Sequence, residues 1–441
     1  MKREPMVFAV AGMIFGFVLG YMAAGFGDAP SSDTRPRPVA EASSRTAPNL
    51  AAPAAGGAAA DGHDHPVGPA DPDEVRTLEN LAARDKQNVQ VRIELGNLYM
   101  DHAQYEEATR WYGEALALKP ADNDVRVDMG ASLLNLGRGP EALAAFDQAL
   151  KNDPGHKKAL FNKGLALMQS GRREEGRDLQ RRALEVAMRI GKPSLKAAAH
   201  NNLALSENHL GNFRAAEAGY QAALAAWRDL HMTVNVGRAM HNLGVVSRRM
   251  GDLPSALDRY RAALEVLLKA GERNLIALNL MSTGDVLVRL GRAEEARAPA
   301  TQALRMAERD GHMLPALDAH IVLAQADMAL GNHADAARHL ATALDGAREH
   351  HFANVVADAV VAIARLITAA TPGEADAAIG WATEVARLPE TSVSVRADAI
   401  ALVGEGRSRS AATRTLEEVA LEARAALATF SARRAARAPV P

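Results

Sequence analysis

The chain has 441 residues, a formal net charge of −2 at pH 7 and no cysteine. The near balance of 51 basic and 53 acidic side chains argues against a nucleic-acid-binding protein, which would carry a basic face. The lack of cysteine excludes disulfides, thiolate metal ligands and a cysteine nucleophile. Only 4% of the residues are aromatic, and alanine and leucine dominate the apolar content, which suits closely packed helices better than strands.

The first predicted element is an uncharged segment from Met6 to Phe26. As a helix it would be about 31 Å long, enough to cross the hydrocarbon core of a membrane. A cleaved signal peptide is the alternative, since Ala23-Ala24-Gly25 could be a cleavage site, but signal-peptide apolar cores span only about 7–15 residues. We therefore expect residues 1–27 to form an uncleaved transmembrane anchor. The positive charges of Lys2 and Arg3 predict a single-pass protein of the bacterial inner membrane with its soluble part in the periplasm.

Three glycines, Gly12, Gly16 and Gly20, recur every four residues along this segment and would form one stripe on the helix. Such a stripe allows another helix to approach closely, which points to a homodimer through the anchor or to a membrane partner. The alternative is that glycine is simply common in membrane helices.

Residues 28–71 are rich in alanine and proline, and Val39, Leu50 and Val67 are their only larger apolar side chains. Such a segment cannot bury enough surface to offset the entropy of ordering, so we expect a disordered linker. His63 and His65 within it could hold a metal loosely, but a solvated linker explains two histidines without further ligands.

A helix-period pattern begins near residue 72 and repeats seven times. A small residue marks each unit, first at intervals of 34 residues and then at intervals of 40: Gly96, Gly130, Gly164, Ala204, Gly244, Gly284 and Ala324. A second small residue follows twelve positions after each marker, and an Ala-Leu pair follows at nineteen and twenty positions. Seven positions after the marker, six of the seven units carry a glycine: Gly137, Gly171, Gly211, Gly251, Gly291 and Gly331.

This pattern predicts two helices per unit, joined by a tight turn whose glycine supplies the backbone freedom. The two small residues would face each other and let the helix backbones cross closely. The Ala-Leu pair would pack against the first helix of the next unit. Because no single pair buries its apolar face, the units would be stabilised by stacking.

The first unit resembles the tetratricopeptide-repeat (TPR) signature, lacking only its first tryptophan. The matching residues are Leu95, Gly96, Tyr99, Ala108, Tyr112, Ala115 and Pro120. The resemblance implies an all-α fold, a right-handed α-solenoid of TPR helix pairs. The later units are similar to the 40-residue class found in kinesin light chains, and the first units with the anchor are similar to membrane-anchored TPR assembly factors.

We expect the array to occupy residues 72–346, with a capping helix over 72–86. Residues 347–432 are expected to be degenerate helical repeats, with helices over 352–368 and 374–388 as an eighth pair. Helices over 392–403 and 411–432 would form a ninth pair, followed by a basic tail at 433–441.

The resemblance also implies that the first helix of each unit lines a concave groove, where the residue two before the marker contacts ligands. Asn162, Asn202 and Asn242 occupy this position, and a carboxamide offers both a donor and an acceptor to a peptide backbone. The neighbouring candidates are Asn201, His241, Asn208, Arg248, Arg249 and Arg289. The arginines could pair with acidic side chains or a carboxylate terminus. The alternative is that these asparagines are structural.

No Walker loop, Gly-x-Ser-x-Gly elbow or His-Glu-x-x-His helix is present, and the 14 histidines show no metal-site spacing. We therefore expect no enzymatic activity, no cofactor and no metal. The sequence predicts a membrane-anchored scaffold or adaptor that binds a peptide segment of partner proteins during assembly of an envelope complex. The alternative is a peptide-responsive sensor or regulator.

Overall fold

The computed structural model describes residues 70–350, 352–388, 393–403 and 414–437. Within these ranges the secondary structure is helical, with no strand. The predicted anchor and all but the last two residues of the predicted linker lie outside the described residues. The chain divides into two compact units: unit 1 comprises Met1–Val246 with Val266–Glu272, and unit 2 comprises Ser247–Glu265 with Arg273–Pro441.

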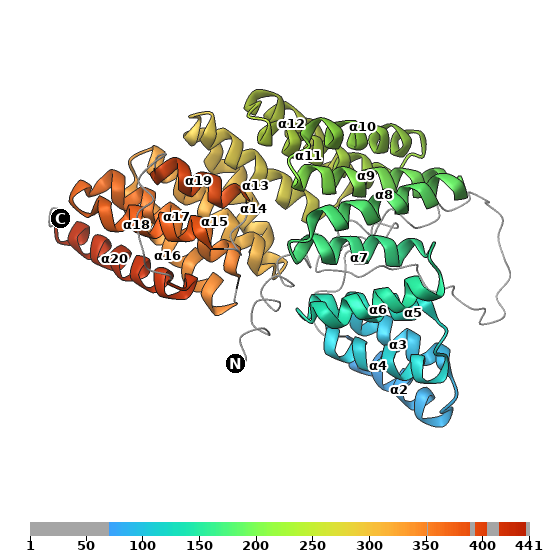
Figure 1. Ribbon diagram of the computed structural model, residues 1–441. Helices are drawn as coiled ribbons and strands as arrows, with labels where there is room; N and C mark the ends of the chain where they lie inside the picture. The colour runs from blue at the N-terminus through green and yellow to red at the C-terminus, as the bar shows by residue number, and fades with distance from the viewer. Residues whose placement is uncertain (1–69, 351, 389–392, 404–413, 438–441) are drawn as a thin grey trace. The chain divides into compact units, whose positions relative to one another are not determined.

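Unit 1 is a succession of antiparallel helix pairs preceded by a single helix (Figure 1). Its helices are α2 (Pro72–Arg84), α3 (Val89–Asp101), α4 (Tyr105–Leu118), α5 (Asn123–Asn135), α6 (Gly139–Asn152), α7 (Lys157–Gln169), α8 (Arg173–Ile190), α9 (Pro193–His209) and α10 (Phe213–Asp229). Two further helices, α11 (Thr233–Arg249) and α12 (Leu253–Ala270), each contribute residues to both units. Each sequence marker lies in the first helix of a pair.

The ends of these helices follow from local chemistry. Asn88, Asp122 and His156 precede α3, α5 and α7, and the side chain of each accepts a hydrogen bond from a first-turn backbone N–H. The turn glycines between paired helices have positive φ, for example +82° at Gly171, where other residues would be strained. In the first pair Ala103 takes this position and adopts φ of +56°.

The markers and the small residues twelve positions after them permit the close helix crossings that the repeat pattern predicts. A Cβ atom at Gly130 would lie 2.6 Å from the ring of Phe146, and one at Gly176 would lie 2.5 Å from the carbonyl oxygen of Gly164. Ala115 and Leu116 of the first Ala-Leu pair are buried in one apolar cluster with Val125 of α5, the first helix of the next pair. These contacts stack one helix pair on the next.

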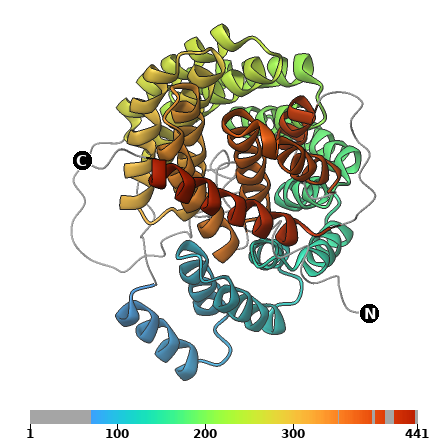
Figure 2. The same cartoon turned by 90° about the vertical axis from the view of Figure 1, so that its left-hand side faces the viewer.

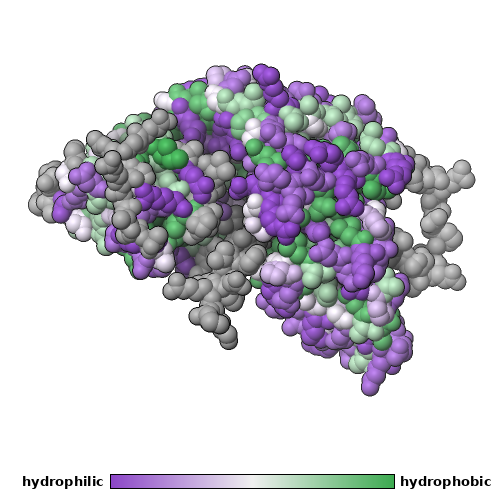
Figure 3. Space-filling model, in the orientation of Figure 1, coloured by the Kyte–Doolittle hydropathy of each residue, from purple (hydrophilic) through white to green (hydrophobic). Residues whose placement is uncertain are grey.

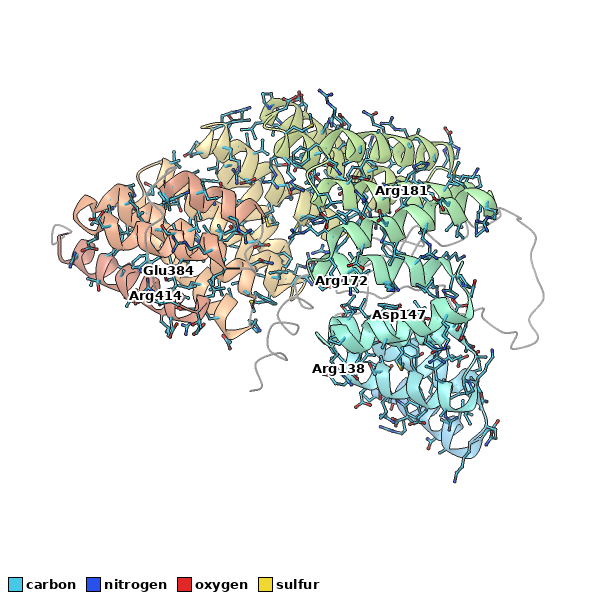
Figure 4. All side chains as sticks on the ribbon, viewed as in Figure 1. Arg138, Asp147, Arg172, Arg181, Glu384 and Arg414 are labelled. Atoms are coloured by element: carbon cyan, nitrogen blue, oxygen red, sulfur yellow. The ribbon has the colours of Figure 1, made fainter. Side chains whose placement is uncertain are left out.

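The second helices of unit 1 carry a polar outer surface. Arg172 pairs with Glu175 at 2.6 Å, and Arg181 pairs with Asp178 at 3.2 Å, all with largely exposed side chains (Figure 4). Hydrophilic residues accordingly cover much of the visible face over α8 to α10 (Figure 3). Exposed ion pairs of this kind add little to the stability of the fold, so we interpret this surface as solvated.

Unit 2 continues the pairing and ends in a single long helix. Its remaining helices are α13 (Arg273–Arg289), α14 (Ala293–Arg309), α15 (Met313–Ala329), α16 (His333–Glu349), α17 (Ala353–Ala370), α18 (Ala375–Arg387), α19 (Val393–Val403) and α20 (Leu416–Arg437). A single 3₁₀ turn, Pro372–Glu374, separates α17 from α18. One apolar cluster extends from Leu317 of α15 to Phe430 of α20.

Among the described residues, one helix, Ala353–Ala370, is long and apolar enough to cross a membrane. This helix, α17, is the central core helix of unit 2, in contact with α16, α18, α19 and α20. Val360, Ile363 and Ile367 are fully buried in the apolar cluster. Its apolar composition is therefore explained by burial inside the protein.

The end of the chain departs from the expected ninth pair. Instead of pairing with α19, α20 packs across α16, α17 and α18 (Figure 2). Its buried side chains Val419, Ala423, Leu427 and Phe430 follow helical spacing and close the apolar cluster. The expected basic tail also begins inside this helix, which runs to Arg437 because alanine and arginine favour helix.

An ion pair with a buried carboxylate joins the segment that precedes α20 to α18, and its loss is expected to be costly. Arg414 donates two hydrogen bonds of 2.7 Å to the carboxylate of Glu384, whose side chain is 5% exposed (Figure 4). Replacing Arg414 by methionine would leave a buried carboxylate without its cation, so we expect a loss of about 3 kcal/mol in the free energy of unfolding. The measurement is chemical denaturation followed by circular dichroism.

The matched control is Arg172→Met, which removes an arginine from the exposed pair with Glu175. This change is expected to leave the midpoint of denaturation unaltered, because the pair is solvated. Equal effects of the two substitutions would show that the Glu384 carboxylate is not buried in solution.

Candidate functional site

The first helices of successive pairs form one face within each unit. In unit 1, α5 contacts α7, and in unit 2, α13 contacts α15, α15 contacts α17, and α17 contacts α19. Residues at equal distances from the markers on these helices therefore lie in rows across neighbouring helices. We refer to this as the first-helix face of each unit.

In unit 1 the predicted asparagines bond to one another. The Nδ2 atom of Asn242 on α11 donates to Oδ1 of Asn201 on α9 at 3.2 Å, and Nδ2 of Asn201 donates to Oδ1 of Asn202 at 3.2 Å. These bonds join two first helices that are 40 residues apart in register. Asn201, Asn202 and Asn242 are thus linked by hydrogen bonds within the protein, whereas no such bond joins Asn162 to them among the described residues.

Most of the predicted residues of unit 1 are buried. Asn162 is 1% exposed, and the exposed fractions of Asn201, Asn202, Asn208 and His241 are 2% to 4%. Asn242 is half-buried. Because a side chain this deeply buried reaches a ligand only if contacts around it rearrange, Asn242 is the most accessible member of the predicted asparagine row. The role of these asparagines and of His241 in peptide binding stays a prediction.

A cluster of charged side chains on α5 and α7 lies next to this row. The Nζ atom of Lys158, whose side chain is 5% exposed, lies 3.5 Å from Asp124 Oδ1 and 3.6 Å from Asp128 Oδ1. Burial acts to lower the pKa of Lys158, but the charges of Asp128 and Asp124 outweigh it and raise that pKa. Hydrogen bonds from His156 and Lys158 lower the pKa of Asp124, whereas burial raises the pKa of Asp128 to about 6.

In unit 2 the predicted arginines have acidic partners of their own. Arg248 pairs with Asp285 at 3.2 Å, and Arg289 pairs with both Asp285 at 2.9 Å and Asp398 at 3.2 Å. Arg365 also pairs with Asp398, at 3.3 Å. Arg248 and Arg289 therefore pair with aspartates of α13 and α19, and their contact with an acidic ligand stays a prediction. Arg249 is half-buried.

Sequence reasoning missed the aspartates of this face. Asp318, Asp358 and Asp398 recur every 40 residues on α15, α17 and α19. This spacing is present in the sequence and could have identified them. Burial raises the pKa of Asp318 to about 7. Burial, with the charges of Asp318, Asp398 and Asp285, raises the pKa of Asp358 to about 8, against the opposing effect of Arg289. Burial and the neighbouring carboxylates therefore disfavour ionisation of Asp318 and Asp358.

No group of three or more histidine, aspartate or glutamate side chains within the described ranges could hold a metal ion. What the first-helix faces offer instead is a set of amide, carboxylate and guanidinium groups arranged in rows. Groups of this kind recognise polar and charged parts of other molecules by hydrogen bonding.

The stacked helix pairs, their turn glycines and the close glycine crossings define a TPR-type protein-interaction scaffold. Residues 158–434 match the family model described as the MalT-like TPR region, and the chain belongs to this family. Residues 90–119 also match a tetratricopeptide-repeat model. No match was found among the curated proteins.

One solved structure shows the same fold, and a second is similar over part of the chain. The crystal structure of a Rap protein complexed with Competence and Sporulation Factor is 13% identical, has a TM-score of 0.54, and aligns over 78% of this chain and 99% of that chain. A tetratricopeptide repeat protein from Parabacteroides merdae is 16% identical, with a TM-score of 0.45, and aligns over 59% of this chain and 93% of that chain.

Proposed function

We propose that this chain binds an extended peptide segment of a partner protein along its first-helix faces. The observation that carries the proposal is the row of polar side chains at one register in successive first helices, Asp128, Asn162, Asn202 and Asn242. A TPR array exposes such a face along its whole length, so a linear segment is the natural ligand. The solved Rap complex supports the capacity of this fold to hold a second molecule.

The proposal is tested by capturing partners with the Asn162, Asn202, Asn242→Ala triple variant. We expect crosslinking and pull-down from solubilised membranes to recover the specific partners at least about tenfold less well than the wild type, because amide contacts to a peptide backbone are lost. The melting midpoint of each variant is measured alongside, since two of the three side chains are buried.

The matched control replaces three exposed amides on second helices, Gln148, Asn152 and Gln221, by alanine. This variant is expected to capture partners as the wild type does. If the folded asparagine variant keeps the same partners, recognition lies elsewhere and the asparagines are structural.

The proposed setting is an assembly factor of a bacterial envelope complex, anchored in the inner membrane by residues 1–27 with its repeats in the periplasm. The length and charge pattern of that segment support it, and the glycines at positions 12, 16 and 20 support a homodimer through the anchor. Membrane fractionation with protease protection tests this placement. Recovery of the full-length chain in the soluble fraction would contradict it.

The second candidate function is a peptide-responsive sensor or regulator. The fold shared with the Rap protein in its complex supports this candidate. Against it, α17 to α20 belong to the core of unit 2, so the described C-terminal region is part of the repeat scaffold and not a separate output domain. A ligand-induced change in hydrogen exchange far from the bound peptide would favour the sensor, and its absence would favour the scaffold.

A further inference from the structure

Two histidine side chains meet between α15 and α16, the two helices of one pair in unit 2. Nδ1 of His320 on α15 lies 2.8 Å from Nδ1 of His339 on α16, and the ring centroids are 5.0 Å apart. Both side chains are half-buried. In such a hydrogen bond one Nδ1 atom donates its hydrogen and the other accepts it with its lone pair. At least one of the two rings must therefore lack a proton on Nδ1.

The same position in the third repeat unit holds two leucines. His320 stands four residues before the marker of its unit, and His339 stands fifteen residues after that marker. Leu160 and Leu179 stand at these distances from the marker Gly164, and both are buried in one apolar cluster. Apolar side chains can therefore pack a helix pair at this position, so the histidines add an ionisable contact that packing does not require.

The charged groups that act on the two rings come from α14, α15 and α16. Nε2 of His339 lies 3.8 Å from Oδ2 of Asp327, whose side chain is 1% exposed. Arg297 of α14 lies 3.3 Å from the other oxygen of Asp327. Arg338 and Asp335 of α16 also act on His339, in opposite directions. The carboxylate nearest to His339 is thus already paired with an arginine.

The other helices in contact with α15 and α16 are α13, α17 and α20, and charged groups on them have partners of their own. Asp318 and Asp358 act on each other between α15 and α17. Four ion pairs engage the others: Arg289–Asp398, Arg365–Asp398, Arg424–Asp345 and Arg348–Glu417. Within the described part of the chain, the strongest charge effects on the two rings therefore come from α14, α15 and α16.

Burial and the contact between the rings oppose their protonation. Burial, followed by the charge of His339, lowers the pKa of His320 to about 4. Burial also lowers the pKa of His339, although Asp327 opposes the shift. When both rings are protonated, each Nδ1 atom carries a hydrogen and the two positive rings face each other. The hydrogen bond is then lost, and the rings repel.

We propose that the His320–His339 contact is an acid-sensitive latch, which holds α15 against α16 near neutral pH and releases them as the pH falls. The latch is a property of the helix pair and goes beyond the proposed function. Because α15 is part of the first-helix face of unit 2, release of this helix would also alter a surface at which partner binding is proposed.

The direction of the effect follows from proton binding. A histidine of the unfolded chain titrates near about 6.5, whereas the pKa of His320 in the folded chain is about 4. Between these two values the folded chain binds fewer protons than the opened chain. The stability contributed by the latch is therefore present above about pH 6.5 and is lost as the pH falls from there toward 4.

Hydrogen–deuterium exchange of the full chain at pH 7.5 and pH 5, followed by mass spectrometry, measures the opening of α15 and α16 locally. The variant His320→Leu with His339→Leu carries the leucine pair that packs α7 against α8. Wild type and variant are compared at the same pH, so that the intrinsic exchange rate cancels. The ratio of wild-type to variant exchange over residues 313–349 is expected to rise about tenfold or more from pH 7.5 to pH 5.

A second variant, His320→Asn, keeps a hydrogen-bonding group near the Nδ1 position but does not titrate. It is expected to lose the acid response without a change in packing from apolar side chains. The matched control is His231→Asn, which removes a histidine from an exposed position between α10 and α11. This control is expected to exchange as the wild type does at both pH values, and α3 and α4 are expected to exchange equally in all variants.

A wild-type to variant ratio that is the same at both pH values, for the folded leucine or asparagine variant, would overturn the latch. A rise in that ratio that is equally large over α3 and α4 would overturn it as well, because the effect would not be local to the histidines. These experiments contain no partner, so they leave the proposed function to be decided by partner capture with the asparagine variant.

Discussion

Replacing Gly176 by alanine is expected to destabilise the protein by about 2–3 kcal/mol, because the added methyl group has no room at the crossing of α7 and α8. A Cβ atom there would lie 2.5 Å from the carbonyl oxygen of Gly164 and 2.5 Å from Cγ of Met168. The carbonyl belongs to the backbone of a packed helix, so the helices must move apart. The free energy of unfolding, measured by urea denaturation and circular dichroism, checks this.

Gly113 provides the matched control, because it also lies inside a helix, α4, but nothing lies within 4 Å of its Cβ position. Gly113→Ala is expected to stabilise the protein by up to about 1 kcal/mol, since alanine is the better helix former. The two substitutions should therefore act in opposite directions. A stabilising Gly176→Ala would mean that α7 and α8 do not cross at these glycines.

Asp358→Asn is expected to stabilise unit 2 at alkaline pH by about 1–3 kcal/mol. The pKa of Asp358 is raised to about 8 by burial and by Asp318 on α15, Asp398 on α19 and Asp285 on α13, while Arg289 on α13 opposes the shift. An unfolded aspartate titrates near about 3.9, so between these two values the folded chain binds more protons than the unfolded chain. Stability contributed by this group is therefore lost as the pH rises from about 4 to 8.

Thermal unfolding of wild type and variant at pH 5 and pH 9 measures this effect. The variant is expected to gain most at pH 9, where the wild type carries an ionised Asp358, and to gain little at pH 5. Asp258→Asn, an exposed change on α12 with the same loss of charge, is expected to shift neither midpoint. A gain that is the same at both pH values would show that ionisation of Asp358 is not the cause.

The helix pairs could be read from the sequence because their determinants are local or strictly periodic. Gly164 and Gly176 are small at the two positions where the repeat requires a close crossing, and the structure places them in contact. The turn glycines appear with positive φ, as at Gly171. The one unit without a turn glycine uses Ala103 in the same conformation, a substitution that the pattern leaves open.

The partners of charged side chains could not be predicted from local or periodic sequence patterns. Arg289 pairs with Asp398, 109 residues further along the chain, and such a pair depends on how many helix pairs separate the two residues in space. The path of α20 was likewise missed. Its apolar stripe indicates a buried face, but periodicity does not specify whether that face meets α19 or the helices α16 to α18.

The sequence by itself determined the TPR class, the helix pairs and the positions of close crossing, because helix period, small residues and turn glycines act within one unit or between neighbours. Only the tertiary structure decided which polar groups are already paired. It showed Arg248 and Arg289 paired with aspartates within unit 2, and Asn201 bonded to Asn202 and Asn242 in unit 1. The physical reason is that pairing and desolvation of polar groups depend on surroundings brought together from distant repeats, which no local pattern encodes.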